Sequence, residues 1–211
     1  PAPASGKVLA FLGSAPSDVW AVAQEDGILH WDGTRWSASL ALQPHSPLDV
    51  WGTAANDVWV VGWADLLVHW DGAAWTVLSE GVPNGGYGEP WVSVWANCAS
   101  DLWVVVGPQI RRWDGSAWSV AYDSPLGWDG RPTERGDDLW AGAPDDLWVV
   151  GGIIPYARVP YNVEHSTVVH GEGVSWTKQT APTENALFAS WTDGHDVWIV
   201  GTWGTILRGA R

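Results

Sequence analysis

The stretch "DVWVVGWADLLVHWDGAAWT", residues 57–76, contains four tryptophans and a "WDG" triplet. Its beginning recurs along the chain as "DVW" or "DLW", with spacings of 39, 44, 45 and 50 residues between the tryptophans. Its end recurs as "LHWDGTRWS" (29–37) and "RRWDGSAWS" (111–119), and in a decayed form as "VHGEGVSWT" (169–177). The stretch is therefore one copy of a repeat, and five copies cover nearly all of the 211 residues.

Each copy contains four strand-like pieces. In the second copy these are "LDVWG" (48–52), "DVWVVG" (57–62), "LLVHW" (66–70) and a piece that begins at Trp75. The second piece is almost continuously apolar, which favours a sheet covered on both faces. The "DG" pair between the third and fourth pieces predicts a tight hairpin turn. Four strands in a period near 40 residues are typical of one blade of a β-propeller.

The sequence thus predicts an all-β fold, a single five-bladed β-propeller domain over residues 1–211. The expected blades cover about 8–47, 48–91, 92–137, 138–186 and 187–211. The last copy ends at "GTILRGAR" and lacks a fourth strand. Closure of that blade by residues 1–7 is one option, although Pro1 and Pro3 make a poor strand. A three-stranded last blade and a longer parent protein are the alternatives.

Sixteen of the 20 tryptophans occupy repeat positions, and we expect their large rings to fill the wedges between neighbouring blades. Four have no repeat position: Trp63, Trp91, Trp128 and Trp203. In an antiparallel blade the first-to-second turns and the "DG" hairpins share one end, which we call the turn end. The second-to-third loops and the connections between copies share the other, the loop end. All four unassigned tryptophans map to the loop end.

The loop end is also where length and content vary between copies, as in binding sites built on a rigid scaffold. The second-to-third loop of the fourth copy, "GGIIPYARVPYNVEHST", is 12 residues longer than its counterparts. We therefore expect a ligand-binding surface of loop aromatics with a few polar side chains. The candidate residues are Trp63, Trp91, Trp128, Trp203, Tyr156, Arg158, Tyr161, His165 and Arg131.

Composition excludes several partners. A net charge of −14 would repel phosphate backbones, so no nucleic-acid partner is expected. No apolar run is long enough to span a membrane. The single cysteine, Cys98, defines no disulfide framework. A start at "PAPASGK" without methionine fits a processed secreted or cell-surface protein, in a bacterial periplasm or outside the cell, and equally fits a trimmed chain.

The chain offers few signals for a metal or for catalysis. His30, His69 and His170 share one repeat position with Arg112 and Arg208, so they are spread over the blades and do not predict a zinc or copper centre. The aspartates before the second strands leave room for structural calcium only as a minor alternative, and no cofactor is expected. Those residues are Asp18, Asp57, Asp101, Asp146 and Asp196. We find no nucleophile elbow, phosphate-binding loop or catalytic triad pattern.

The segments "SAPSDVWAV" and "GILHWDGTRW" resemble the tryptophan-rich propeller repeats of secreted bacterial proteins. The "WDGxxWS" hairpin is similar to that of seven-bladed bacterial lectins, and five blades are the architecture of the tachylectin family. The resemblance implies glycan binding. The hairpin departs by one residue from the Asp-box of sialidases, whose arginine cluster and tyrosine nucleophile we cannot place here.

These observations favour a non-enzymatic extracellular binding module with lectin-like carbohydrate recognition through the loop aromatics. A protein-interaction or structural propeller of a larger surface or secreted protein is the alternative, and a glycan-active hydrolase or lyase is the third. The expected partner is a glycan or a protein.

Overall fold

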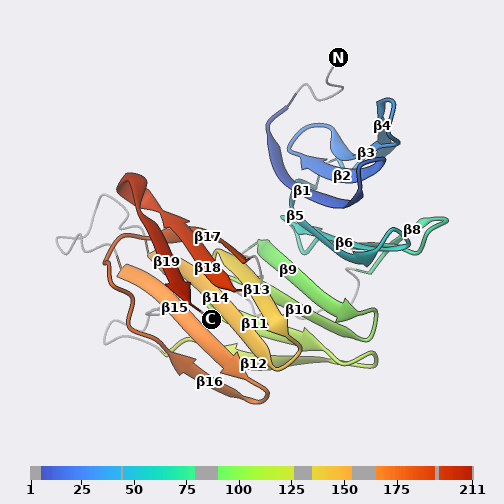
Figure 1. The fold of residues 1–211 in the computed structure, drawn as a ribbon. Coiled ribbons are helices and arrows are strands. Elements are labelled where there is room, and N and C mark those ends of the chain that lie inside the picture. The colour runs from blue at the N-terminus through green and yellow to red at the C-terminus, as the bar shows by residue number, and fades with distance from the viewer. Residues whose placement is uncertain are drawn as a thin grey trace. The chain divides into compact units, whose positions relative to one another are not determined.

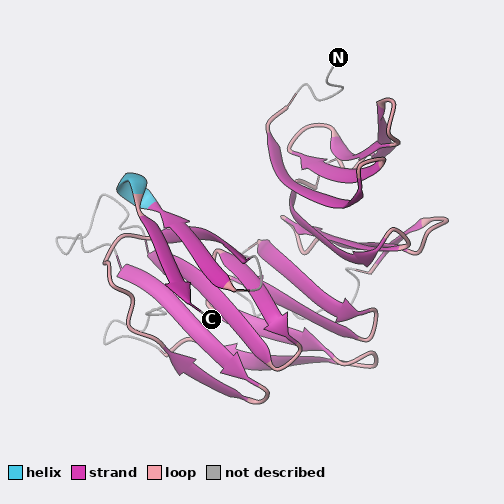
Figure 2. Ribbon diagram, in the orientation of Figure 1, coloured by secondary structure: helices cyan, strands magenta, loops and turns pink. Residues whose placement is uncertain are grey.

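A computed structural model describes residues 6–43, 45–78, 90–125, 135–153, 165–192 and 195–210. The chain forms two compact units, residues 1–106 with 112–118 and residues 107–111 with 119–211, and each is described by itself. The described residues are almost entirely β-strands and turns (Figures 1 and 2). Their one helical piece is the short 3-10 turn η1 (Thr202–Gly204).

The strands form five antiparallel sheets in which neighbours in the chain are neighbours in the sheet. Four sheets have four strands each, β1–β4, β5–β8, β9–β12 and β13–β16, and the last, β17–β19, has three. The strands of the first three sheets are β1 (Val8–Ala15), β2 (Asp18–Ala23), β3 (Gly27–Trp31), β4 (Trp36–Leu40), β5 (Pro47–Ala54), β6 (Asp57–Gly62), β7 (Leu67–Trp70), β8 (Trp75–Val77), β9 (Trp91–Cys98), β10 (Asp101–Val106), β11 (Gln109–Trp113) and β12 (Trp118–Asp123). Those of the last two are β13 (Asp138–Ala143), β14 (Asp146–Ile153), β15 (His165–Glu172), β16 (Ser175–Lys178), β17 (Leu187–Thr192), β18 (Asp196–Gly201) and β19 (Ile206–Ala210).

The predicted fold class, a five-bladed β-propeller with an incomplete last blade, is confirmed. Of the segment considered for closing that blade, residues 1–5 lie outside the described residues. The next two residues pair within the first blade, where the Gly6 amide donates to the Asp26 carboxylate and the Gln24 amide donates to the Lys7 carbonyl. The extension of the blades over 1–211 as one domain stays a prediction.

The blades repeat in register as well as in order. Trp20 of β2 is opposite His30 of β3, and Trp59 of β6 is opposite His69 of β7. In the fourth and fifth blades Trp148 is opposite His170, and Trp198 is opposite Arg208. The equivalent positions inferred from sequence spacing are therefore equivalent in space within each blade.

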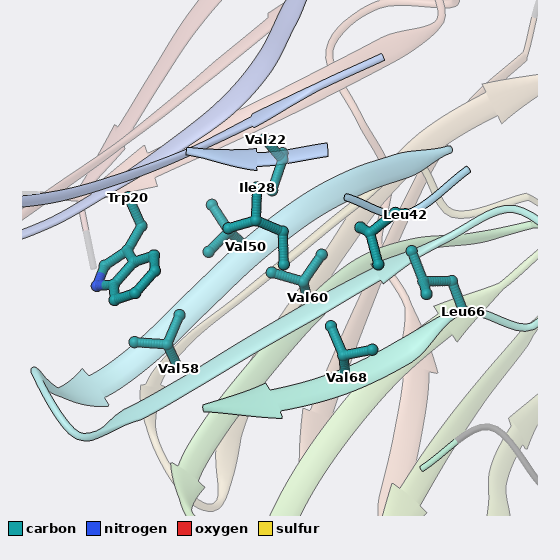
Figure 3. Packing of buried hydrophobic residues seen from close by; sticks show 9 residues of the cluster. All are labelled: Trp20, Val22, Ile28, Leu42, Val50, Val58, Val60, Leu66 and Val68. Atoms are coloured by element: carbon teal, nitrogen blue, oxygen red, sulfur yellow. The ribbon is translucent and has the colours of Figure 1, made fainter. Parts of the chain in front are cut away.

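In the first unit, apolar side chains of two neighbouring blades form one core. Figure 3 shows Val22 and Ile28 from the first blade against Val50, Val60 and Val68 from the second. The tryptophans close this wedge, because the Trp20 ring lies 5.6 Å from that of Trp70 and 5.4 Å from that of Trp75. A second core gathers Trp59 with Trp113 and Trp118 of the third blade. The predicted structural role of the repeat tryptophans is confirmed in this unit.

Neighbouring blades are also joined by an aspartate on their first strands. In the first unit, Asp49 accepts hydrogen bonds from the Ser93 hydroxyl at 2.9 Å and from the Val94 amide at 3.0 Å. In the second unit, Asp138 accepts from both the amide and the hydroxyl of Ser190, each at 2.6 Å. Charge-assisted hydrogen bonds of this kind fix the register between strands of adjacent blades.

Candidate functional site

The turn end of each blade is occupied by a repeated network of side chains. His30 Nε2 lies 2.6 Å from Asp18 Oδ1, and the His30 ring stacks on Trp20 at 4.2 Å. His69 repeats this arrangement with Asp57 at 2.7 Å and with Trp59 at 4.0 Å. In the fourth blade the His170 ring lies 4.0 Å from that of Trp148, and its Nε2 lies 2.8 Å from Asp146. These histidines therefore hold hairpins together, as predicted.

The third and fifth blades use arginine in place of this histidine. Arg112 Nε donates to Asp101 Oδ1 at 2.9 Å, and its guanidinium lies 5.0 Å from the Trp103 ring centre. In the fifth blade the Arg208 guanidinium lies 5.3 Å from the Trp198 ring and pairs with Asp196. Both side chains present a planar group that covers indole and donates to carboxylate. Among the described residues no three histidine, cysteine or acidic side chains form a group able to hold a metal ion.

The "DG" hairpins pack onto the first-to-second turns at the same end. Asp32 accepts hydrogen bonds from the Thr34 hydroxyl and from the amides of Thr34 and Arg35, which lower its pKa to about 2. The hydrogen bonds from Ser116 and Ala117 similarly lower the pKa of Asp114 to about 2. These carboxylates are committed to turn geometry.

The loop end of the second blade carries the first candidate feature, Trp63, whose side chain is 50% exposed. Its amide donates to the Ser46 carbonyl at 2.9 Å, and its carbonyl accepts from the Leu66 amide at 3.3 Å. Between them Ala64 and Asp65 both have left-handed backbones, with φ of 57° and 59°. Left-handed residues other than glycine are uncommon and persist only where the surroundings impose them. The loop is thus a rigid turn that displays an indole ring.

A pocket of about 440 Å³ adjoins this turn. Its apolar wall comes from Leu40, Ala41, Leu42, Ala64, Leu66 and Val77, and its polar groups come from Gln43, His45 and Asp65. His45 Nδ1 is buried and has no hydrogen-bond partner among the described residues. A buried ring nitrogen without a partner has lost its hydration, so a ligand group that bonds to it recovers free energy. The pocket can therefore take an apolar side chain that carries, or lies beside, one polar group.

The equivalent loop of the fifth blade, in the second unit, displays Trp203, which is 84% exposed. The backbone of Trp203 is also left-handed, with φ of 56°. The Thr205 amide donates a hydrogen bond to the Thr202 carbonyl across this residue, at 3.0 Å. The Thr202 amide donates to the Ala186 carbonyl at 2.8 Å, as Trp63 does to Ser46. A bulky residue in this conformation is an outlier, and such outliers concentrate at functional sites.

The structure changes the set of predicted site residues. Trp91 is completely buried at the start of β9, where its ring meets Trp118 edge-on at 5.3 Å, so its assignment to the binding surface is wrong and it belongs to the core. His165 begins β15. The remaining candidates lie outside the described residues: Trp128, Arg131, Tyr156, Arg158 and Tyr161.

Sequence reasoning missed the pocket and His45. The connection "LQPHSP" (42–47) lies on the predicted variable end, but a lone histidine in a loop carries no pattern that distinguishes it. Only the approach of Leu66 and Val77, distant in the chain, makes the cavity around it.

No known family model matches the chain, and no curated protein matches it. Solved structures match it in fold. A virginiamycin B lyase from Staphylococcus aureus, solved as the inactive H270A form with quinupristin, is similar with a TM-score of 0.67 and 15% identity, over 98% of this chain and 67% of the lyase. The WD40 propeller domain of Doa1 is similar with a TM-score of 0.64 and 8% identity, over 98% and 66% of the two chains.

A chain of the mitotic checkpoint complex is similar with a TM-score of 0.63 and 12% identity, over 98% of this chain and 61% of that one. The chain thus spans about two thirds or less of the length of these propellers. Among the described residues, no helix has the length and apolar character needed to cross a membrane. At identities of 8–15% the comparisons show a shared β-propeller fold.

Proposed function

We propose that this protein is a non-enzymatic interaction module whose loop end binds a protein partner, with Trp63 and the adjoining pocket as the anchor point. The observation that carries the proposal is a half-exposed indole on a rigid turn beside a pocket of about 440 Å³. Tryptophan is enriched among the few residues that supply most of the energy of protein interfaces. A side chain of the partner would fill the pocket while Trp63 covers it.

The rigid turn supports the proposal energetically. Ordering a flexible loop on binding costs free energy, and a loop already held by backbone hydrogen bonds avoids that cost. The hydrogen bonds of Trp63 to Ser46 and Leu66 hold the loop in this way. Trp203 on the second unit has the same kind of support and is a second candidate contact.

The comparisons also favour this reading. One similar propeller was solved as part of a protein complex, the mitotic checkpoint complex. Carbohydrate recognition, which the resemblance to propeller lectins implies, is the competing proposal for the same exposed indole. Sugar sites combine a stacking ring with several hydrogen-bonding groups. The described lining of the pocket contains no indole or phenol ring on which a sugar could stack; it combines four aliphatic side chains larger than alanine with the polar groups of Gln43, His45 and Asp65.

Parallel screening separates the two ligand classes. The protein is applied to a displayed library of linear peptides and to a glycan array, and binders are retested with Trp63→Ala. Val174→Ala, at an exposed position of a turn-end hairpin, is the matched control. We expect peptide binders that lose at least about tenfold in affinity with Trp63→Ala and are unaffected by the control. Glycan binders sensitive to Trp63→Ala, without peptide binders, would overturn the proposal.

A further inference from the structure

The apolar side of the pocket beside Trp63 is continuous with the protein core. Leu42 and Leu66 line the pocket, and both are buried members of the core that the first two blades share (Figure 3). The other large aliphatic side chains of the lining, Leu40 and Val77, are partly buried and exposed, respectively. Such a surface suits the methylene stem of a long side chain, whose polar head then needs hydrogen-bond partners.

Two neutral acceptors belong to the turn that ends in His45. The His45 amide donates to the Leu42 carbonyl at 2.7 Å, which fixes the residue in this turn. His45 Nδ1 is buried without a hydrogen-bond partner among the described residues, and a neutral imidazole accepts at one of its ring nitrogens. Gln43 Nε2 donates to the Glu25 carbonyl at 3.3 Å, a bond that does not use the amide oxygen of Gln43. The pocket therefore favours a ligand group with several donors.

The charge of the pocket comes from Asp65. No lysine or arginine is present in its described lining. A carboxylate accepts several hydrogen bonds at once, so the contacts that Asp65 makes within the chain leave capacity for a ligand. The whole first unit is acidic, with 12 aspartates and glutamates against Lys7, Arg35 and Arg112, and the two arginines pair with aspartates at the turn end. A cationic ligand group is therefore favoured.

The protein itself shows which cation suits an aspartate beside an indole. Arg112 and Arg208 each pair with an aspartate while the guanidinium lies within 5.3 Å of a tryptophan ring centre. At the pocket, Trp63 and Asp65 belong to one tight turn. A guanidinium offers five donors in a plane, enough for a carboxylate and two further acceptors, whereas an ammonium group offers three. Arginine is thus a better match than lysine.

We propose that the pocket binds an arginine side chain of the protein partner, an inference that rests on the proposed function. The stem of the arginine packs on Leu42 and Leu66, and its guanidinium pairs with Asp65. His45 Nδ1 and the amide oxygen of Gln43 are the further acceptors. Charge-assisted hydrogen bonds of this kind are about twice as strong as neutral ones, so the guanidinium accounts for much of the selectivity.

The first test is the sequence of the peptides that the parent protein selects from a displayed library. We expect arginine in the binders whose affinity falls with Trp63→Ala, and no such enrichment in a selection on Asp65→Asn. Binders that depend on Trp63 but lack arginine would overturn the arginine proposal and leave the proposed function intact. A library that gives no binder would overturn both.

Variants of one selected peptide separate a bound guanidinium from general attraction to an acidic protein. Citrulline has the shape of arginine without its charge, and leucine has only an apolar side chain. Each replacement should weaken binding to the parent at least about tenfold, and lysine should weaken it about threefold. On Asp65→Asn the arginine peptide should bind about tenfold more weakly, and citrulline should then cost less than about threefold, because the two groups interact.

The protein variants have matched controls. Asparagine tolerates the left-handed backbone of Asp65, so Asp65→Asn should keep the turn. Asp71→Asn removes the same charge at the turn end of the same blade and retains a turn acceptor, so it should leave peptide affinity unchanged. His45→Phe keeps a ring without Nδ1 and should weaken the arginine peptide about threefold to tenfold, with little effect on the leucine peptide.

Three results would overturn the arginine proposal. The leucine or lysine peptide might bind the parent as tightly as the arginine peptide, or Asp65→Asn and Asp71→Asn might weaken binding equally. Dimerisation of the free protein that Asp65→Asn abolishes would identify a second copy of the chain as the occupant. Because each of these results is compatible with peptide binding that depends on Trp63, the proposed function is tested separately.

Discussion

At the scale of single residues, the turn-end network has histidine in some blades and arginine in others at the same repeat position. Three blades place histidine between an aspartate and an indole, and two place arginine there. What the position requires is a flat group that donates a hydrogen bond and covers the tryptophan. Whether the side chain is histidine or arginine differs from blade to blade, whereas its contacts with an aspartate and a tryptophan are repeated.

Replacing His69 tests this equivalence. His69→Ala removes the hydrogen bond to Asp57 and the ring that covers Trp59, so we expect the free energy of unfolding to fall by about 2 kcal/mol. His69→Arg should retain most of the stability, because Arg112 and Arg208 make the same contacts in their blades. Chemical denaturation measures both variants. Equal losses in the two would show that the position needs histidine itself.

Gly62, the last residue of β6, is required for a close approach of backbone. A Cβ there would lie 2.2 Å from the Ser46 carbonyl oxygen, and Gly151 and Gly201 approach the carbonyls of Arg135 and Ala186 in the same way. We expect Gly62→Ala to destabilise the protein by about 1–3 kcal/mol in thermal or chemical unfolding, because the neighbouring backbone must move.

Gly13 provides the matched control for Gly62. A Cβ added at Gly13 would have a methyl carbon of Val19 as its nearest neighbour, at 3.7 Å, which is an ordinary van der Waals contact. Gly13→Ala should therefore leave stability unchanged or slightly raised. A comparable loss in both variants would mean that the cost arises from strand propensity and not from the Ser46 carbonyl.

At the scale of elements, the residue that precedes β13, Asp137, has a carboxyl group with a raised pKa. Burial raises the pKa of Asp137 from 3.8 to about 6, against the opposing effect of Arg135 at 3.9 Å. A pKa raised on folding contributes stability below about pH 4, and this contribution is lost as the pH rises through 6.

Asp137→Asn removes that titration. We expect the variant to match the parent below pH 4 and to exceed it by about 2 kcal/mol above pH 7, because the asparagine needs no ionisation at a partly buried position. Unfolding measured from pH 3.5 to 8 gives the two curves. Parallel curves across this range would contradict the raised pKa.

The strands and hairpins could be predicted from the sequence because each recurs in four or five copies. A pattern that recurs in several copies identifies a strand more clearly than a single stretch does. The "DG" turn requires a left-handed glycine, as Gly33, Gly72 and Gly115 show with φ of 90–94°. The site could be predicted only in part. The loop end and Trp63 followed from the absence of a repeat position, but the same criterion misassigned Trp91, since a residue outside the pattern can still begin a buried strand.

At the scale of the whole molecule, the proposed binding site lies where the chain departs from the repeat. The pocket beside Trp63 could not be predicted because its walls come from a connection, a turn and a strand that only the tertiary structure brings together. The three-stranded last blade could be predicted from the sequence, because the fifth copy contains no fourth strand-like piece.

The net charge of −14 has a measurable consequence at this scale. Long-range attraction should accelerate association with a basic peptide. Raising the salt concentration from 50 to 500 mM shortens the screening length about threefold, so it should slow association while affecting dissociation less. Stopped-flow kinetics measures both rates. A neutral peptide of the same length is the control, and equal salt dependence for the two would exclude electrostatic steering.

The most direct test of the central claim is calorimetric titration of a peptide selected on this protein into the parent, Trp63→Ala and Val174→Ala. The proposal predicts saturable peptide binding that Trp63→Ala weakens at least about tenfold and that Val174→Ala leaves unchanged. Peptide affinity that is indifferent to Trp63, or saturable binding of an oligosaccharide by a protein that selects no peptide, would contradict it.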